Sequence, residues 1–93
     1  MAFVYVLRSI KDEKLYIGST RQLLVERLVR HNKGQVPSTR MRIPFTLLYS
    51  ESFDDFSNAR KRELYLKSGS GREYLLRILA KRAGTQAAKG VRL

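Results

Sequence analysis

Val4-Tyr5-Val6 and Tyr16-Ile17-Gly18 are the two stretches that decide the fold of this chain. Phe3 to Leu7 is apolar at every position, which is typical of a strand buried on both faces. Ser9 to Glu13 is polar and turn-like, and Leu15 to Gly18 has the composition of a returning strand. The chain is therefore expected to begin with a β-hairpin that places the two tyrosines on paired strands.

A helix is expected after this hairpin. Ser19 or Thr20 offers its N-terminal cap, the helix should run to about Asn32, and Gly34 should end it. Lys33 to Pro44 is then a loop that carries several basic and hydroxyl side chains.

The second half of the chain adds one strand and two helices. Phe45, Leu47 and Tyr49 alternate so that all three can face one side of a strand. Ser57 is the expected cap of a helix ending near Lys67, and the following Ser-Gly-Arg-Glu has the form of a capping box that opens a last helix at Ser70. The predicted fold class is α/β (α+β), a small, mostly antiparallel three-stranded sheet flanked by helices in the order β-β-α-β-α-α.

The length of the chain fits one small domain. Its 93 residues, of which 43% are hydrophobic, can build one modest core. We expect residues 1–83 to form that domain and residues 84–93 a basic, flexible tail. Cysteine is absent, which excludes disulfides and thiolate metal sites. With no apolar run near the roughly 18–20 residues of a membrane span, and no basic segment before the first apolar stretch, a cytoplasmic location is expected.

Positive charge is the strongest compositional signal. Nineteen Lys and Arg against eight Asp and Glu give a net charge of +11. This excess favours a polyanionic partner, because phosphate binding releases condensed counterions. A membrane surface is a weaker alternative, since no basic amphipathic helix has a Trp- or Phe-rich face; a basic structural or ribosome-associated protein would share the balance. The basic residues expected to contact nucleic acid are Arg21, Lys33, Arg40, Arg42 and Lys67.

The first helix carries two polar residues at the border of its apolar arc. Arg27 and His31 are four residues apart and therefore share an azimuth. That position, between core and surface, is where the walls of a cleft are built. The apolar arc itself is expected to contain Leu24, Val25, Leu28 and Val29.

The second helix places a carboxylate where an apolar residue is expected. Glu63 lies on one stripe with Ala59 and Leu66, so it should point inward. A buried charge is costly unless it is paired or holds a metal. Glu63 therefore either pairs with Arg27 or Arg60, or binds a cation.

Together these residues suit phosphodiester hydrolysis, which needs an activated water, a Lewis acid and a cation on the phosphoryl oxygens. Glu63 can hold Mg²⁺, because Mg²⁺ keeps several waters and takes substrate phosphate as a further ligand. Arg27 offers a forked, permanently charged donor for phosphate. Tyr5, Tyr16 or His31 can accept a proton or position the water, although a tyrosine with its ordinary pKa near 10 is a poor base unless a cation lowers that pKa.

The order Tyr5, Tyr16, Arg27, His31, Glu63 resembles the GIY-YIG nuclease superfamily over nearly the whole chain. The similarity is to its small stand-alone bacterial-type members, related to the nuclease domain of UvrC-type repair endonucleases. The resemblance implies that the two tyrosines, the arginine and the metal-binding glutamate are active-site residues, and a histidine four residues after the arginine is common in related members. It also implies a small central antiparallel sheet flanked by helices, and one-metal hydrolysis with Mg²⁺ or Mn²⁺.

Three departures from the family pattern stand out. Only the tyrosine of the first motif is kept, which is usual for the family. Ser19 stands where the repair-nuclease branch has a lysine, a charge that Arg21 could supply. The segment between Gly18 and Arg27 is one residue longer than in many members.

The expected function is therefore a metal-dependent DNA endonuclease in repair or recombination. The chain has no room for a separate DNA-reading domain, and backbone contacts position without specifying sequence. Cleavage directed by DNA shape, such as a flap, branch or lesion, or only weakly by sequence, is expected, with a protein partner able to add specificity. The alternative is a non-catalytic nucleic-acid-binding module on the same fold.

Overall fold

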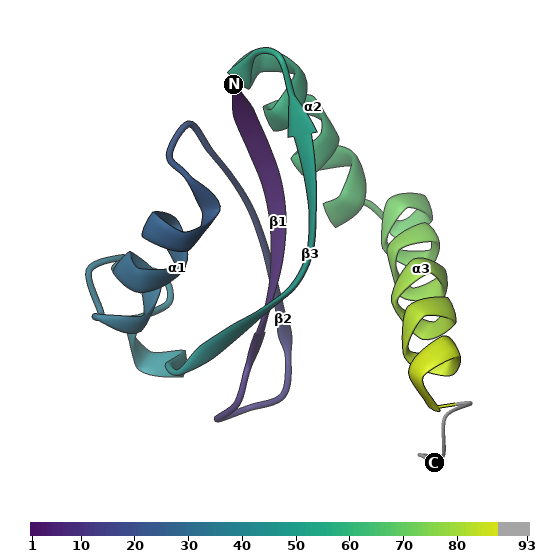
Figure 1. Cartoon of the computed structure of the whole chain (residues 1–93), viewed down its shortest axis with the longest axis horizontal. Coiled ribbons are helices and arrows are strands. Elements are labelled where there is room, and N and C mark those ends of the chain that lie inside the picture. The colour runs from purple at the N-terminus through teal and green to yellow at the C-terminus, as the bar shows by residue number, and fades with distance from the viewer. Residues whose placement is uncertain (88–93) are drawn as a thin grey trace. The chain divides into compact units, whose positions relative to one another are not determined.

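The computed structural model describes the backbone of residues 1–87 and the side chains of residues 1–81. The predicted fold class and element order are confirmed (Figure 1). The chain divides into two compact units, Met1–Glu63 and a second that begins at Leu64, and each is described by itself. The elements are β1 (Ala2–Ser9), β2 (Leu15–Thr20), α1 (Leu24–Asn32), the 3-10 turn η1 (Arg40–Arg42), β3 (Phe45–Phe53), α2 (Phe56–Lys67) and α3 (Gly69–Ala87).

β1 is the central strand of the sheet. The strand order is β2-β1-β3 and both pairings are antiparallel. Val4, Tyr5, Val6 and Leu7 are all at most 2% exposed, so the prediction of a strand buried on both faces is confirmed. Its uninterrupted apolar run is what a strand with a neighbour on each edge and packing on each face requires.

β3 contains a β-bulge that the alternation of its side chains did not predict. Val6 pairs with Tyr49 while Leu7 pairs with Leu47, so Leu48 is the extra residue. A bulge interrupts the two-residue period of a strand. Phe45 and Leu47 pair with Ser9 and Leu7, which are two residues apart on β1, so they share a face as predicted. Tyr49 lies beyond the bulge and pairs with Val6, so it points to the other face and the prediction is wrong there.

α1 begins later than expected. Ser19 and Thr20 belong to β2, and Leu23 occupies the N-cap position without a side-chain capping bond. The Thr20 hydroxyl instead accepts the backbone N–H of Gln22 at 3.0 Å, which shapes the turn between strand and helix. The prediction of a Ser19 or Thr20 cap is therefore wrong, because both residues lie in β2 and the helix begins only after them.

The packed face of α1 also differs from the predicted arc. Leu24 and Leu28 are half-buried as expected, but Val25 and Val29 are 65% and 44% exposed. His31 is fully buried. The helix thus buries His31 within the packed face, whereas Arg27 is half-buried, at the border of that face as predicted.

α2 is capped by a different residue from the one predicted. The Asp55 Oδ1 atom accepts the backbone N–H of Asn58 at 2.8 Å, three residues on, which is the geometry of an N-cap aspartate. Ser57 lies inside the helix. Ala59 and Glu63 are 0% and 3% exposed, so the predicted inward direction of the glutamate is correct.

In the second unit, α3 begins at Gly69, so the expected capping box at Ser70 is wrong. The Ser68 hydroxyl accepts the backbone N–H of Gly71 at 3.3 Å and caps the helix. A Cβ at Gly71 would lie 1.8 Å from the Tyr65 carbonyl oxygen, so this close approach requires glycine. The helix runs on through residues 84–87 of the predicted tail. The rest of that segment, residues 88–93, lies outside the described residues, and the flexible tail stays a prediction.

Candidate active site

Tyr5 and Gly18 face each other across the β1–β2 pair. A Cβ at Gly18 would lie 2.6 Å from the Tyr5 hydroxyl oxygen and 3.0 Å from a ring carbon of Tyr16. Real side chains cannot occupy that space, so the Tyr5 ring is able to cross β2 only because this position has no side chain. The glycine of the second motif therefore places the tyrosine of the first.

The Tyr5 hydroxyl is the centre of a hydrogen-bonded cluster, defined here as the tyrosine cluster (Tyr5, Arg27, His31 and Thr39). Arg27 Nε donates to the Tyr5 oxygen at 3.2 Å, and the Tyr5 hydroxyl lies 2.9 Å from His31 Nε2. Both partners come from α1, one turn apart. The orientation of α1 is thus what joins three of the predicted site residues.

Thr39 fixes the state of His31 in this cluster. Its hydroxyl oxygen lies 2.8 Å from His31 Nδ1 and donates to the carbonyl of Val36 at 3.4 Å. With the Thr39 proton committed to that carbonyl, Nδ1–H donates to the Thr39 oxygen, and Nε2 is left to accept the proton of Tyr5. Every donor between Arg27 and the Val36 carbonyl then has an acceptor.

Burial sets the charge of the tyrosine cluster. Burial, together with the positive charges of Arg27 and Arg30, lowers the pKa of His31 to about 4, so the imidazole is neutral at neutral pH. Burial also raises the pKa of the Tyr5 hydroxyl above 10, while the bond from Arg27 partly opposes that rise. The tyrosine is therefore protonated at rest and needs a proton acceptor to become a base.

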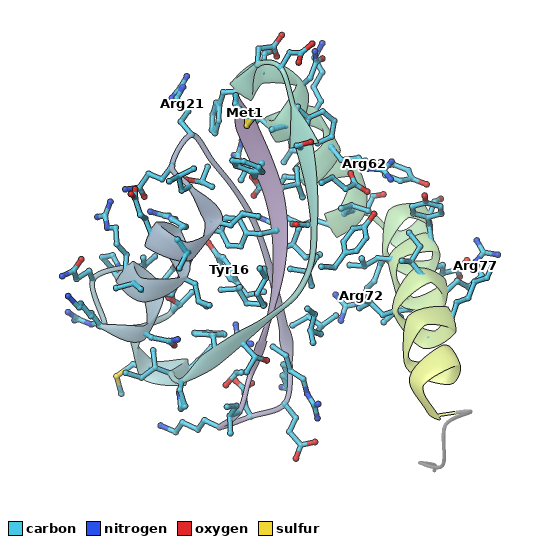
Figure 2. The ribbon with its side chains drawn as sticks, in the orientation of Figure 1. Met1, Tyr16, Arg21, Arg62, Arg72 and Arg77 are labelled. Atoms are coloured by element: carbon cyan, nitrogen blue, oxygen red, sulfur yellow. The ribbon has the colours of Figure 1, made fainter. Side chains whose placement is uncertain are left out.

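Tyr16 lies between the sheet and α1 (Figure 2), where its ring contacts other rings. Its ring centroid is 5.2 Å from that of His31 and 6.5 Å from that of Phe45. The Phe45 ring contacts the histidine as well, at 5.9 Å. Edge and tilted contacts of this kind hold the imidazole plane in place.

Glu63 forms a second cluster, defined here as the glutamate cluster (Ser19, Arg60 and Glu63). The carboxyl oxygen Oε1 accepts the Ser19 hydroxyl at 2.5 Å and Arg60 Nη1 at 2.9 Å. Of the two expected partners, Arg60 is therefore the arginine that contacts this oxygen. Gly18 and Ser19 are consecutive in β2, so this one strand contributes a residue beside Tyr5 and a residue bound to Glu63. The charge of Glu63 contributes to the raised pKa of Tyr5.

An ion pair between α2 and β3 sets the orientation of α2. Arg62 donates two hydrogen bonds to the carboxylate of Glu51, at 2.8 and 3.1 Å, and the Tyr49 hydroxyl donates to the same carboxylate. Burial raises the pKa of Glu51, but the bonds from Arg62 and Tyr49 outweigh it and leave a net lowering. Because Arg62 and Glu63 are neighbours in α2, this bidentate pair fixes the rotation that turns Glu63 inward.

The donor set fits a magnesium or manganese ion with few protein ligands. Among the described residues, no group of three His, Cys, Asp or Glu side chains could form an all-protein cage. One buried carboxylate beside a serine hydroxyl is instead an all-oxygen set of the kind that Mg²⁺ accepts, since it retains waters and binds substrate phosphate. Glu63 is the residue of this set that carries charge.

The five basic residues expected to contact nucleic acid lie in different surroundings. Lys33 and Arg40 are exposed. Arg21 places its guanidinium 4.1 Å from the centre of the Phe56 ring, and Lys67 belongs to the second unit. Their contacts with nucleic acid remain predictions.

Arg42 differs from the others because it is bound to the β1–β2 turn. Its Nε donates to Asp12 at 2.7 Å, and Nη2 reaches the carbonyl oxygens of Lys14 and Leu15 at 3.2 and 3.4 Å. The Arg42 hydrogen bond is the main reason why the pKa of Asp12 falls to about 2.

Sequence reasoning missed two groups of this site. Thr39 lies eight residues beyond His31 in a loop, where neither periodicity nor charge singles it out. The contact between Ser19 and Glu63 joins positions 44 residues apart, and it was visible only as an unexplained departure from the family pattern. Arg60 was considered as a partner of Glu63 and is one.

Residues 1–74 match the model of the GIY-YIG catalytic domain. The chain belongs to the GIY-YIG family. Its relatives include small bacterial UPF0213 proteins. The one from Staphylococcus saprophyticus is 36% identical over 74 residues, covering 78% of this chain and 88% of that protein. Those from Clostridium perfringens and Streptococcus pyogenes are 39% identical over 82 and 80 residues, covering 87% and 85% of this chain and 86% and 85% of the respective relatives.

No solved structure matches the chain. Within residues 1–87, no helix has the length and apolar character needed to cross a membrane.

Proposed function

We propose that this protein is a metal-dependent endonuclease that hydrolyses phosphodiester bonds in DNA. The observation that carries the proposal is the Tyr5 hydroxyl, held between a cation at 3.2 Å and a neutral imidazole nitrogen at 2.9 Å. A structural tyrosine does not need both a base and a positive charge at its oxygen. A nucleophile-activating tyrosine needs both.

In the proposed reaction, a water oxygen attacks phosphorus and the bond to the leaving oxygen breaks. The water proton passes to the Tyr5 oxygen while the Tyr5 proton passes to His31 Nε2. His31 becomes an imidazolium that still donates Nδ1–H to Thr39, and the leaving oxygen takes a proton from solvent. Tyr5 is preferred over Tyr16 as the base because its hydroxyl contacts both the acceptor and the cation.

Arg27 is proposed to stabilise negative charge in two places, on the Tyr5 oxygen and on the phosphate. Its Nε bond to Tyr5 stabilises negative charge on the phenol oxygen. The forked guanidinium also matches the geometry of phosphoryl oxygens, where charge grows as the phosphorus–oxygen bond breaks.

Glu63 is the proposed protein ligand of Mg²⁺ or Mn²⁺, with Ser19 holding one carboxyl oxygen in place. When bound, the ion supplies Lewis-acid stabilisation of charge on the phosphate and the leaving oxygen.

The proposed substrate is DNA recognised by shape, and repair or recombination is the proposed setting. The net charge of +11 supports phosphate binding, which fixes position without reading sequence. A partner protein would supply any further specificity.

A supercoiled plasmid tests the proposal. Nicking is expected with Mg²⁺ or Mn²⁺ and should stop when EDTA removes the metal. The Tyr5→Phe variant keeps the ring packing but loses the hydroxyl, so it should bind DNA normally and nick at least about 100-fold more slowly. DNA binding with no nicking by the native protein would favour the non-catalytic module instead.

A further inference from the structure

The glutamate cluster contains a cation of its own beside the carboxylate proposed to bind a metal. Arg60 Nη1 lies 2.9 Å from Glu63 Oε1, and the Ser19 hydroxyl donates to the same oxygen. The arginine precedes the glutamate by three residues on α2, one helical turn away. A positive charge on a proposed metal ligand is expected to oppose the binding of another cation there.

The two ends of this ion pair differ in exposure. The side chain of Glu63 is 4% exposed, whereas that of Arg60 is 53% exposed. The carboxylate is held by the packed stripe of α2 and by Ser19. The guanidinium is attached to a flexible stem in contact with solvent, so it is the end that can leave.

We propose that Arg60 is a displaceable counter-ion that keeps the metal affinity of Glu63 low until DNA is bound. This inference rests on the proposed function. A backbone phosphate offers the guanidinium the same paired oxygens as a carboxylate, so Arg60 exchanges one anion for another. Its departure removes one positive charge from the Glu63 carboxylate, and a divalent cation then binds beside the phosphate.

This exchange couples the two binding events. If DNA raises the affinity for the metal, the metal must raise the affinity for DNA by the same factor. Loading of the metal would then depend on substrate, and the free protein would hold little metal at low concentrations of free ion.

Manganese binding to the free protein tests the first half of the inference. Mn²⁺ affinity is measured by electron paramagnetic resonance for the native protein, Arg60→Gln and Lys61→Gln. Lys61 is exposed and adjacent, so its variant removes the same charge without touching Glu63 and serves as the matched control. Arg60→Gln should bind Mn²⁺ about three- to tenfold more tightly than Lys61→Gln, which is the scale of a partly buried ion pair.

DNA affinity tests the second half. Fluorescence anisotropy with a short labelled duplex is measured with and without Mn²⁺, in a Tyr5→Phe background that prevents cleavage. Mn²⁺ should strengthen DNA binding when Arg60 is present, and this gain should shrink by at least half in Arg60→Gln. The Glu63→Gln variant reports the effect of Mn²⁺ on the DNA backbone alone, and circular dichroism verifies that each variant is folded.

The outcomes separate two kinds of failure. Equal Mn²⁺ binding by Arg60→Gln with and without the additional Glu63→Gln change would mean that the proposed metal site is wrong. Metal binding that needs Glu63 but is the same in Arg60→Gln and Lys61→Gln would overturn the counter-ion role alone. Tighter Mn²⁺ binding by Arg60→Gln with an unchanged gain on DNA would show competition without exchange, which also contradicts the inference.

Discussion

The tyrosine cluster and the glutamate cluster both place charged or polar groups inside a small domain, but they satisfy those groups differently. In the tyrosine cluster a chain of hydrogen bonds runs inside the protein from Arg27 Nε through Tyr5, His31 and Thr39 to the Val36 carbonyl, and every acceptor in it is uncharged. In the glutamate cluster a buried carboxylate is matched by a guanidinium that is half exposed. The first arrangement resists change, since any lost bond leaves a buried group unsatisfied. The second can exchange its partner.

This difference suits the two proposed roles. A group that transfers a proton must keep its geometry in every state, and the tyrosine cluster is preorganised in that sense. A metal ligand must accept and release an ion, which a fully satisfied carboxylate could not do. The predictions below test whether the clusters differ in this way.

The largest effect is expected from Glu63→Gln. The amide is nearly isosteric but has no charge to hold a metal. Mg²⁺-dependent nicking should be abolished in a plasmid assay, while folding and DNA affinity stay intact or affinity rises slightly. A folded Glu63→Gln variant with native activity would end the proposed mechanism. If the variant instead fails to fold, Glu63 has a structural role as a buried ion pair.

Arg27→Lys should reduce cleavage by about 100-fold, because lysine keeps the charge but loses the fork and the Nε bond to Tyr5. DNA affinity should change less than about threefold, since the lost contact acts on charge that develops during the reaction. Single-turnover rates and anisotropy measure the two quantities separately. Near-native cleavage by the lysine variant would show that the tyrosine cluster tolerates loss of its cation.

Thr39→Val should lower the cleavage rate about tenfold with unchanged DNA affinity. Valine has a similar shape, but it leaves His31 Nδ1–H without its acceptor in a buried place, at a cost of about 1–3 kcal/mol. Thr39→Ser restores the hydroxyl and should recover most of the rate. A serine variant as impaired as the valine variant would point to packing by the methyl group rather than to the hydrogen bond.

His31 should also make stability depend on pH. Its pKa is about 4 in the folded protein, against about 6.5 when unfolded, so the unfolded chain binds more protons between these values. The contribution of the neutral ring is complete above pH 6.5 and is lost as the pH falls toward 4, by at most about 3 kcal/mol. Melting temperatures of the native protein and His31→Gln should therefore converge on acidification through this window. A constant difference between the two would mean that His31 is not kept neutral by folding.

The two clusters were not equally predictable from the sequence. The inward direction of Glu63 followed from a stripe with Ala59, because a helical period is local information. Which side of α1 packs against the sheet could not be predicted in the same way. Val25 and Val29 belong to the apolar arc of the helix, yet the fold leaves both exposed. Which side of a helix packs depends on the sheet beneath it, and a pattern of alternating valines and leucines cannot supply that.

Contacts between distant segments were also beyond a local pattern. Asp55 and Ser68, not the expected serines, cap α2 and α3, because each strand or turn ends at a residue that tertiary packing decides. The need for glycine at position 18 is likewise visible only in the structure, where the Tyr5 ring occupies the space that a side chain there would fill. Family resemblance supplied the predicted site residues, while the structure supplied the hydrogen bonds that separate them into two clusters.

The smallest effects are expected from two arginines in the loop before β3. One of them is exposed and the other is bound to a carboxylate, which repeats the contrast between an exchangeable charge and a fixed one. Arg40 is exposed, whereas Arg42 is bound to Asp12 and to two carbonyl groups of the hairpin turn. Arg40→Ala should weaken DNA binding two- to threefold for all sequences, and reduce the slope of log affinity against log salt by about 0.9, the value of one phosphate contact. Arg42→Ala should leave that slope nearly unchanged and lower the melting temperature instead, because its guanidinium already has an anionic partner.

Asp12→Asn is the matched control, since it should reproduce the loss of stability without removing a positive charge. An equal loss of salt dependence in both arginine variants would show that Arg42 leaves Asp12 for the phosphate, and that the hairpin turn exchanges its charges as the glutamate cluster is proposed to do.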